Sequence, residues 1–393
     1  MKILHTADWH LGRYLGAYEL LGLQSEAIEG VVGIAREERP DAIVIAGDLY
    51  DRSVPSEDAM RIFETAIVRL REIAPVLAIA GNHDGAGRVG HFASVLEASG
   101  IHVASSDFGP VRHVKLRDRH GDVLFHLMPF AMPIEARQAL GDRVADADPA
   151  TLSTHHGVTA ARLSTIDRHP GARHVLVAHL FTQSGGAAEE SESERDISVG
   201  GSSIVSASLF DGFHYVALGH LHKPHDVIPG RLRYAGSIGR YSFSEESHDK
   251  SVSIVEIGGD GATVVREVPI PGGIAMRTIG GSFMDVLRRA PDDEASRTAF
   301  VRIRLDDAVP QFEAFRRLRE HYPRLVEVTY ARTTASPDTS PALERPERRD
   351  PMEMVRAFCR DRLGTAALST EAMQLAEALM EEAREVRAVT EEL

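Results

Sequence analysis

The chain contains 393 residues, of which 43% are hydrophobic and 26% are charged, and this is enough for two or three folded domains. A peptide hormone, a disulfide-bonded miniprotein and a lone binding module are therefore excluded. The one cysteine, Cys359, cannot form an internal disulfide, so nothing in the sequence requires an oxidising compartment. The formal net charge of −14 by itself argues against a nucleic-acid-binding protein. That argument is weak, because bound metal ions and a local group of arginines can hold phosphates on an acidic protein.

The beginning of the chain has the pattern of a buried strand. Met1 and Lys2 lead directly into Ile3-Leu4-His5-Thr6-Ala7, without the apolar segment of a signal peptide. No apolar run approaches the roughly 18 residues that a membrane span requires. We therefore expect a cytoplasmic protein that does not contact a membrane.

The first hundred residues alternate between short apolar runs and amphipathic stretches of helical length. This alternation is typical of βαβ units with a parallel or mixed sheet and helices on its faces. Strands are predicted at 2–7, 42–47 and 76–81, and helices near 19–38, 56–72 and 88–99.

The pattern changes after residue 110. Turn residues 118–121 separate two alternating segments, which predicts a hairpin. An acidic stretch without period at 184–194 predicts a loop. The further predicted strands are 111–118, 122–128, 174–179, 214–219, 251–257 and 262–268.

A second, smaller domain is predicted after the Pro-Ile-Pro-Gly-Gly segment that begins at Pro269. Its expected elements are a strand at 275–279, a helix at 282–290, a strand at 299–305, a helix at 310–321 and a strand at 325–332. Proline-rich residues then predict a linker, followed by two amphipathic helices at 351–363 and 370–388. The predicted organisation is a main α/β domain at 1–270, a small α+β domain at 271–335, a linker at 336–350 and a helical segment at 351–393.

Five short motifs with polar, metal-ligating side chains stand at or near the predicted strand ends. Asp8 and His10 lie two residues apart on an extended segment, as do His220 and His222, so each pair is expected to face one side. Strand ends in an open α/β sheet are where side chains converge on a ligand. The motifs are Asp8-Trp9-His10, Gly47-Asp48-Leu49-Tyr50-Asp51, Gly81-Asn82-His83-Asp84, Ala178-His179 and Gly219-His220-Leu221-His222.

Together the motifs supply carboxylate, imidazole and amide groups. These groups suit a pair of divalent metals bridged by one carboxylate, and they are compatible with manganese, iron or zinc. Any single histidine among the 19 in the chain is more often a surface or core residue than a ligand. The occurrence of all five motifs in one chain, each after an apolar run, is what indicates the metal site.

With these motifs the chain resembles the calcineurin-like metallophosphoesterase superfamily. It is similar in particular to the SbcD family, the bacterial nuclease subunit of the SbcCD double-strand-break repair complex. The resemblance implies a β-sandwich of mixed sheets flanked by helices, with a capping domain and C-terminal helices. The closer similarity rests on residues 5–12, 47–51 with Pro55 and Ser56, 81–84, 217–222 and 234–237.

The resemblance also implies roles for individual residues. Asp8, His10 and His222 would hold one metal, Asn82, His179 and His220 the other, and Asp48 would bridge them. The two ions, manganese by family preference, would activate a water for in-line attack on phosphorus. His83 would not be a ligand: with Asp84 orienting its ring, it would protonate the leaving oxygen. Asp51 stands where archaeal and eukaryotic relatives carry a second active-site histidine, so that histidine's role cannot be transferred.

The resemblance implies a DNA nuclease of end processing, repair and recombination. The expected activities are double-strand 3′-5′ exonuclease and single-strand or hairpin endonuclease, assisted by an SbcC-type coiled-coil ATPase. The chain has no Gly-x-x-x-x-Gly-Lys-Ser/Thr loop, so ATP dependence would come from the partner. The C-terminal helices either bind this partner or pack on their own domain. A homodimer through 56–72 and 88–99 is a family expectation, and so are phosphate contacts by arginines of the small domain: Arg302, Arg304, Arg316, Arg317 and Arg319.

Two alternatives remain. A phosphatase or cyclic-nucleotide phosphodiesterase would use the same chemistry, but Leu11, Ser53 and Asp84 stand where the protein-phosphatase pattern has Gly, Gly and Glu. A non-catalytic scaffold would be expected to have lost ligands, and all seven ligand positions are occupied.

Overall fold

The computed structural model describes residues 1–141, 151–183, 192, 194 and 204–331. Met1–Ala331 form one compact unit, which contains the regions of both predicted domains. The predicted linker at 336–350 and the predicted helices at 351–363 and 370–388 lie outside the described residues, as does most of the predicted acidic loop.

The first of two six-stranded sheets carries the N-terminal strand. β1, β4, β5 and β6 run parallel, and β15 and β16 continue the sheet in antiparallel pairing. In order across the sheet, the strands are β16 (Thr263–Pro269), β15 (Ser251–Ile257), β1 (Lys2–Thr6), β4 (Ala42–Ala46), β5 (Val76–Ile79) and β6 (Ile101–Ala104).

The second six-stranded sheet has parallel strands at its centre and one antiparallel strand at each edge. The order is β13 (His225–Ile228), β14 (Leu232–Tyr234), β12 (Tyr215–Gly219), β9 (Arg173–His179), β8 (Gly121–Met128) and β7 (Arg112–Asp118).

The two sheets face each other across a buried apolar layer. Val44 and Leu77 of the first sheet belong to the same core cluster as Phe125 and Val177 of the second. Burial on both faces explains why β4 reads as an uninterrupted apolar run, Ala-Ile-Val-Ile-Ala. The expected sandwich of mixed sheets is confirmed.

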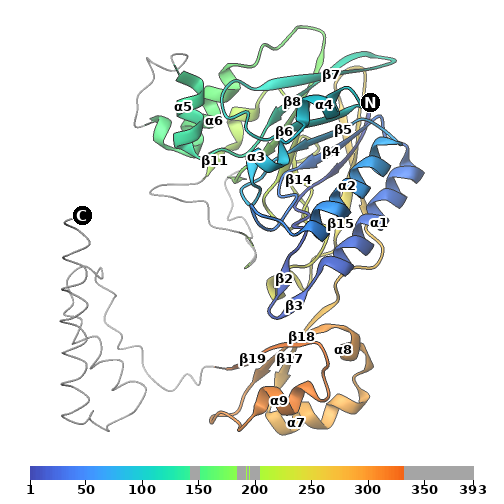
Figure 1. Cartoon of the computed structure of the whole chain (residues 1–393), viewed down its shortest axis with the longest axis vertical. Coiled ribbons are helices and arrows are strands. Elements are labelled where there is room, and N and C mark those ends of the chain that lie inside the picture. The colour runs from blue at the N-terminus through green and yellow to red at the C-terminus, as the bar shows by residue number, and fades with distance from the viewer. Residues whose placement is uncertain (142–150, 184–191, 193, 195–203, 332–393) are drawn as a thin grey trace, which may run out of the picture. The chain divides into compact units, whose positions relative to one another are not determined.

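Helices cover the outer face of the first sheet (Figure 1). α1 (Leu21–Glu38) and α2 (Glu57–Arg71) pack their apolar sides against β4 and β5 in one core cluster. α2 begins where the side chain of Ser56 accepts a hydrogen bond from the Ala59 N–H, with acidic residues in its first turn. Both features stabilise a helix N-terminus.

Several elements differ from the sequence expectation. The predicted helix at 88–99 is two short helices, α3 (Ala86–Val89) and α4 (Ala93–Glu97), because Phe92 adopts a left-handed φ of 62° between them. Other short elements were not predicted: the β2–β3 hairpin (Tyr14–Leu15, Tyr18–Glu19), β6, α5 (Pro133–Leu140), α6 (His155–Ser164), the β10–β11 pair (Thr182–Gln183, Val205–Ser206), β13, β14, and single turns at Thr151–Ser153, Ala207–Phe210, Phe243–Glu245 and Ala290–Asp292.

A smaller three-stranded sheet follows the sandwich. Its strands are parallel, in the order β17–β18–β19, and its helices pack on it in a separate core cluster. A parallel sheet with helical crossovers makes this region α/β in detail, where the sequence predicted α+β. Its elements are β17 (Met276–Gly281), α7 (Phe283–Arg289), α8 (Glu294–Thr298), β18 (Phe300–Leu305), α9 (Ala314–Arg319) and β19 (Leu325–Tyr330).

Among the described residues, every helix is too short or too polar to cross a lipid bilayer.

Candidate metal centre

The predicted site residues lie where strands of both sheets end. Asp8 follows β1, Asp48 follows β4, and Asn82 follows β5 in the first sheet, whereas His179 ends β9 and His220 follows β12 in the second. The carboxyl ends of these parallel strands meet at one edge of the sandwich. The structure therefore brings together side chains that lie up to 214 residues apart in the sequence.

The expected strand alternation does not explain this convergence. Asp8 and His10 lie in a loop beyond β1, with φ values of 53° and 45°, and Asp48 and His220 have φ values of 49° and 111°. Left-handed backbone at residues other than glycine is unfavourable and occurs most often at functional sites. The side chains thus converge through strained turns and not through the two-residue period of a strand.

Glycine is required beside two of these residues. Gly47 has a φ of +93°, and a Cβ there would overlap the imidazole of His179. A Cβ at Gly81 would overlap the carboxylate and backbone of Asp48. These two glycines therefore allow the close approach of the His179 and Asp48 side chains.

Asp48 is the centre of the arrangement. Its Oδ2 atom lies 3.5 Å from Nε2 of His10 and 3.5 Å from Nε2 of His179, and its Oδ1 accepts a hydrogen bond of 2.8 Å from the backbone N–H of His83. Two sets of potential ligand atoms lie within 4.8 Å of one another, His10 with Asp48 and His83, and Asp8 with Asp48 and His179. Asp48 belongs to both sets, as a bridging ligand must.

Asn82 joins two histidines on one side of Asp48. Its Oδ1 atom lies 2.8 Å from Nε2 of His179 and 3.3 Å from Nδ1 of His220. These three residues form the group that the resemblance assigns to one metal.

The other predicted group is less complete. The Nε2 atoms of His10 and His222 lie 3.1 Å apart. The contacts of Asp8 are with His220, whose backbone N–H it accepts at 3.0 Å, and with His179 at 3.8 Å. The grouping of Asp8 with His10 and His222 therefore stays a prediction.

The chemistry of the donor set fits a cation. Nδ1 of His179 faces the carbonyl oxygen of Ala46 at 2.9 Å, so the ring proton lies there and Nε2 presents a lone pair. That lone pair faces the Asn82 oxygen and the Asp48 carboxylate, both of which are acceptors. Three acceptors directed at one another are stabilised by a metal ion between them.

Protonation of the imidazole rings is disfavoured, whereas Asp8 is the group of the site that holds a proton most readily. Burial, followed by the neighbouring histidine charges, lowers the pKa of His10 well below its usual value. Burial and the charge of His179 lower the pKa of His220 to about 3. Burial and the negative charge of Asp48 raise the pKa of Asp8 well above the usual aspartate range. Neutral imidazoles suit a divalent cation as they are, and binding of the cation would release the proton of Asp8.

The expected contact between Asp84 and His83 is corrected by the structure. Asp84 accepts hydrogen bonds from the backbone N–H groups of Gly81, Leu49 and Tyr50, at 2.8, 3.1 and 3.0 Å. The ring of His83 instead places Nδ1 2.9 Å from the carbonyl oxygen of Asp51. Asp84 points back into the loops because three unpaired N–H groups surround it, and it therefore supports the loop after β4.

His83 nevertheless points into the site. Its Nε2 atom is buried without a hydrogen-bond partner among the described residues and lies 4.0 Å from Oδ2 of Asp48. With the Nδ1 proton directed at Asp51, Nε2 is the atom that faces Asp48.

Some residues of the site carried no sequence signal. Gln24 donates to the carbonyl oxygens of Trp9 and His10, at 3.0 and 2.7 Å, and holds the strained turn. Glu245 contacts the ring of His222, and the side chain of Glu194, in the predicted acidic loop, accepts the His222 backbone N–H at 2.7 Å. Only the fold places these residues at the site.

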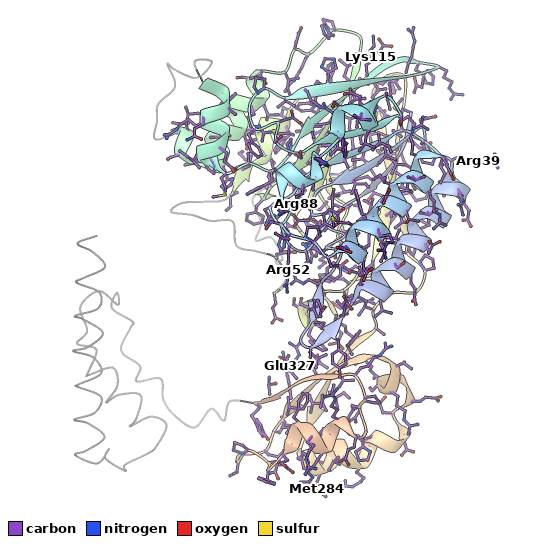
Figure 2. All side chains as sticks on the ribbon, in the orientation of Figure 1. Arg39, Arg52, Arg88, Lys115, Met284 and Glu327 are labelled. Carbon is purple, nitrogen blue, oxygen red and sulfur yellow. The ribbon has the colours of Figure 1, made fainter. Side chains whose placement is uncertain are left out.

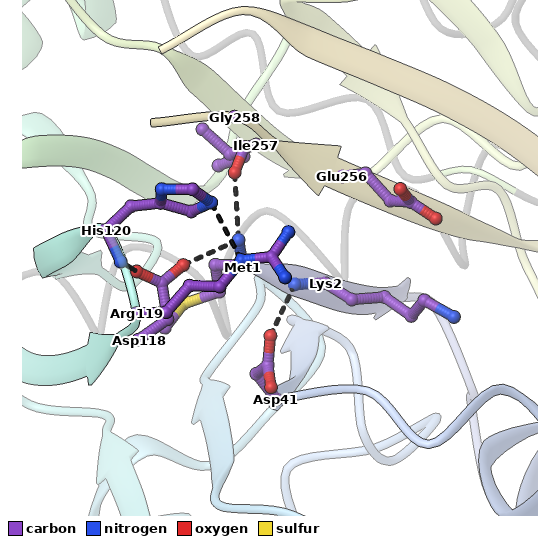
Figure 3. A pocket seen from close by; sticks show the side chains of 9 residues that line it. All are labelled: Met1, Lys2, Asp41, Asp118, Arg119, His120, Glu256, Ile257 and Gly258. Atoms are coloured by element: carbon purple, nitrogen blue, oxygen red, sulfur yellow. Dashed lines mark hydrogen bonds and ion pairs between the residues drawn. The ribbon is translucent and has the colours of Figure 1, made fainter. Parts of the chain in front are cut away.

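A separate cavity of about 490 Å³ lies at the opposite ends of the strands. Its lining residues include Lys2, at the start of β1, and Asp41, just before β4 (Figure 3). The N-terminal amine pairs there with Asp118 at 2.7 Å. Its lining contains none of the predicted site residues.

Two family models match the chain. The model described as "Calcineurin-like phosphoesterase" matches residues 1–224, and the SbcD C-terminal model, described as "Type 5 capsule protein repressor C-terminal domain", matches residues 274–362. The chain belongs to the calcineurin-like phosphoesterase family, and with this site it is a metal-dependent phosphoesterase. The pair of domains is that of the SbcD family, so the resemblance drawn from the motifs is confirmed.

Solved structures were also found at low similarity. The protein TT1561 of Thermus thermophilus matches with 13% identity and a TM-score of 0.38, over 68% of this chain and 98% of its own. A dimetal phosphatase from Danio rerio matches with 13% identity and a TM-score of 0.41, over 68% of this chain and 96% of its own.

Proposed function

We propose that this protein is a manganese-dependent DNA nuclease that acts with an SbcC-type ATPase in DNA end processing, repair and recombination. The observation that carries the proposal is the joining of an SbcD C-terminal domain to a phosphoesterase domain. A phosphatase or cyclic-nucleotide phosphodiesterase of the same family would have the metal centre without that second domain.

The site supports phosphodiester hydrolysis. A pair of divalent metals held by Asp8, His10, Asp48, Asn82, His179, His220 and His222 would activate water and offset the charge on the phosphoryl oxygens. Asp48 and Asn82 fix the positions of the histidines around them. His83 lies beside Asp48, with its proton on Nδ1 held by the Asp51 carbonyl. A second proton, on Nε2, would then be available for the leaving oxygen, and the Asp48 and Asp51 carboxylates would stabilise the resulting cation.

The arginines of the small domain divide into two groups. Arg302 is buried, 4.8 Å over the ring of Phe243 and 3.6 Å from Glu327, and Arg317 lies over the ring of Phe283. Arg304, Arg316, Arg317 and Arg319 are all exposed, but Arg316 pairs with Glu313. We therefore assign phosphate contacts to Arg304 and Arg319, together with Arg52, which stands at the surface beside the loop of Asp51 (Figure 2).

The proposed homodimer has a surface available. α2 and α4, with the residue that precedes α4, expose the apolar side chains of Met60, Val68, Phe92 and Val95, by 41 to 64%. We expect the proposed interface to cover these side chains, because a contiguous exposed apolar patch is typical of an interaction site. The partner ATPase would bind the predicted helices of 351–393, outside the described residues.

The experiment that tests the proposal compares three substrates with manganese present. Purified protein should degrade linear duplex DNA faster than it hydrolyses p-nitrophenyl phosphate or a cyclic nucleotide. His83→Gln should remove DNA cleavage while the protein remains folded by circular dichroism. Hydrolysis of the small esters without cleavage of DNA would replace the nuclease by the phosphatase alternative.

A further inference from the structure

A buried acid–base pair contacts the Nδ1 side of the His222 ring, whereas the Nε2 side faces His10. Nδ1 of His222 lies 3.0 Å from Oε1 of Glu245, and Oε2 of Glu245 lies 2.6 Å from Nζ of Lys250. The side chains of Glu245 and Lys250 are 0% and 7% exposed. Burying both charges is unfavourable unless each is well paired, so the pair requires an explanation.

All three protons of Lys250 are directed at acceptors. Besides Glu245, the Nζ atom donates to Oγ of Ser237 at 2.8 Å and to the carbonyl oxygen of His222 at 3.0 Å. The hydroxyl of Ser237 in turn donates to the carbonyl oxygen of Gly239 at 2.8 Å. The side-chain atom of residue 245 that faces Lys250 must therefore be a hydrogen-bond acceptor.

The other carboxylate oxygen of Glu245, Oε1, then determines which ring nitrogen of His222 carries the proton. A carboxylate accepts hydrogen bonds only, so Nδ1 of His222 carries the ring proton and Nε2 presents its lone pair. That Nε2 atom lies 3.1 Å from Nε2 of His10, within the metal centre. Hydrogen bonds of this kind orient metal-binding histidines and strengthen them as ligands.

We propose that Glu245, held by Lys250, is the positioning residue that fixes the Nδ1–H form of His222 and directs its Nε2 lone pair into the metal centre. This inference rests on the proposed function, because it takes His222 as a ligand. The positive charge of Lys250 also acts on Asp8, where it opposes the rise in the pKa of that carboxyl.

The substitution Glu245→Gln is a direct test of the proposal because it keeps the shape of the side chain. Lys250 requires an acceptor, so the amide oxygen should turn toward it and the amide N–H₂ toward His222. Nδ1 then becomes an acceptor and the ring proton moves to Nε2. The double variant Glu245→Gln with Lys250→Met removes this requirement, and the amide can turn its oxygen back to His222.

The test uses the full chain and two readouts. Long-range ¹⁵N–¹H NMR of the metal-free protein, with the His222 signals assigned by their loss in His222→Asn, reports the position of the ring proton. Electron paramagnetic resonance of free Mn²⁺ reports the affinity of each binding site. The matched control is Glu246→Gln, because Glu246 contacts the backbone N–H of Thr278 and no predicted ligand.

We expect the Nδ1–H form in the wild-type protein and in the control. In Glu245→Gln the proton should lie on Nε2, and one of two manganese affinities should fall about 10- to 100-fold, with partial recovery in the double variant. An Nε2–H form in the wild type, or full manganese affinity in Glu245→Gln, would overturn the inference. Manganese binding that His222→Asn leaves unchanged would instead overturn the metal centre itself.

Discussion

The side-chain oxygen of Asn82 lies 2.8 Å from Nε2 of His179, whose other ring nitrogen faces the carbonyl oxygen of Ala46. Two acceptors thus face each other inside the protein, and the carboxylate of Asp48 lies 3.5 Å from the same nitrogen. Asn82 is half-buried and His179 is buried, and acceptors that face each other in such a place are stabilised by a cation between them. The relationship is the most direct structural argument for a metal centre.

The first prediction is that manganese stabilises the folded protein. A ligand at 100 times its dissociation constant adds about 2.7 kcal/mol to the free energy of unfolding. Differential scanning fluorimetry should show a higher melting temperature with Mn²⁺ and a return to the original value with EDTA. Asn82→Ala should reduce the increase, and an unchanged melting temperature in the wild type would contradict the prediction.

The second prediction concerns Asp48→Asn. The variant should lose at least roughly 10²- to 10³-fold in kcat, because the bridging charge is removed. In the metal-free protein, repulsion by Asp48 contributes to the raised pKa of Asp8. A carboxyl whose pKa is higher in the folded protein than in the unfolded one lowers the free energy of unfolding as the pH rises above the unfolded-state pKa. The reason is that the unfolded state releases its proton first. Metal-free Asp48→Asn should therefore be at least as stable as the wild type at pH 7, measured by urea unfolding.

A variant less stable than the wild type under these conditions would contradict that explanation. It would mean that Asp48 stabilises the metal-free fold through its contacts with His83 and His179 by more than its repulsion of Asp8 destabilises it.

The third prediction concerns the glycine that His179 packs against. Gly47→Ala introduces a Cβ that overlaps His179, at a φ of +93° that alanine rarely adopts. We expect a loss of at least about 1–3 kcal/mol in the free energy of unfolding, with weaker metal binding. Gly33→Ala is the matched control: Gly33 lies within α1 with no atom within 4 Å of the added Cβ. It should stabilise the protein by about 0.5–1 kcal/mol, and equal effects of the two substitutions would contradict the prediction.

The fourth prediction is acid sensitivity that arises outside the site. His126 is buried against His174, with Nε2 2.9 Å from its Nδ1, and His113 and Arg168 are its other charged neighbours. Burial and the charge of His174 lower the pKa of His126 to about 3. The unfolded state binds this proton first as pH falls below about 6.5, so stability declines between about pH 6.5 and 3.

His126→Gln removes that proton. The free energy of unfolding of the variant should fall less steeply with decreasing pH than that of the wild type. The two slopes should differ by up to about 1.4 kcal/mol per pH unit. Urea unfolding at several pH values between 4 and 7 measures the slope, and the exposed His321 provides a control substitution. An identical slope in wild type and His126→Gln would contradict the assignment.

The sequence predicted the sandwich well because its buried strands are continuous apolar runs with clear ends. It predicted β1, β4 and β5 within two residues. It missed α5, α6 and the strand pairs of two to four residues, since short elements depend on tertiary contacts more than on periodicity. Phe92 shows the same limit: its left-handed φ of 62° interrupts a helix that the local pattern favours.

At the site, the sequence predicted which side chains gather and misjudged how. Asp8 and His10 converge through a left-handed turn held by Gln24, which no pattern in the motif reveals. Asp84 was predicted to contact His83, its neighbour in sequence, but the backbone N–H groups around it attract its carboxylate more strongly. Glu245 reaches His222 from a segment without any recognisable motif.

The central claim is that the predicted ligands hold two metal ions on either side of Asp48. Crystals grown with Mn²⁺ and measured at the manganese absorption edge test it most directly. The account predicts two anomalous peaks, each within about 2.0–2.3 Å of Asp48 and of histidine nitrogens from the set described, and loss of at least one peak in Asp48→Asn. No anomalous peak beside Asp48, or two unchanged peaks in Asp48→Asn, would contradict it.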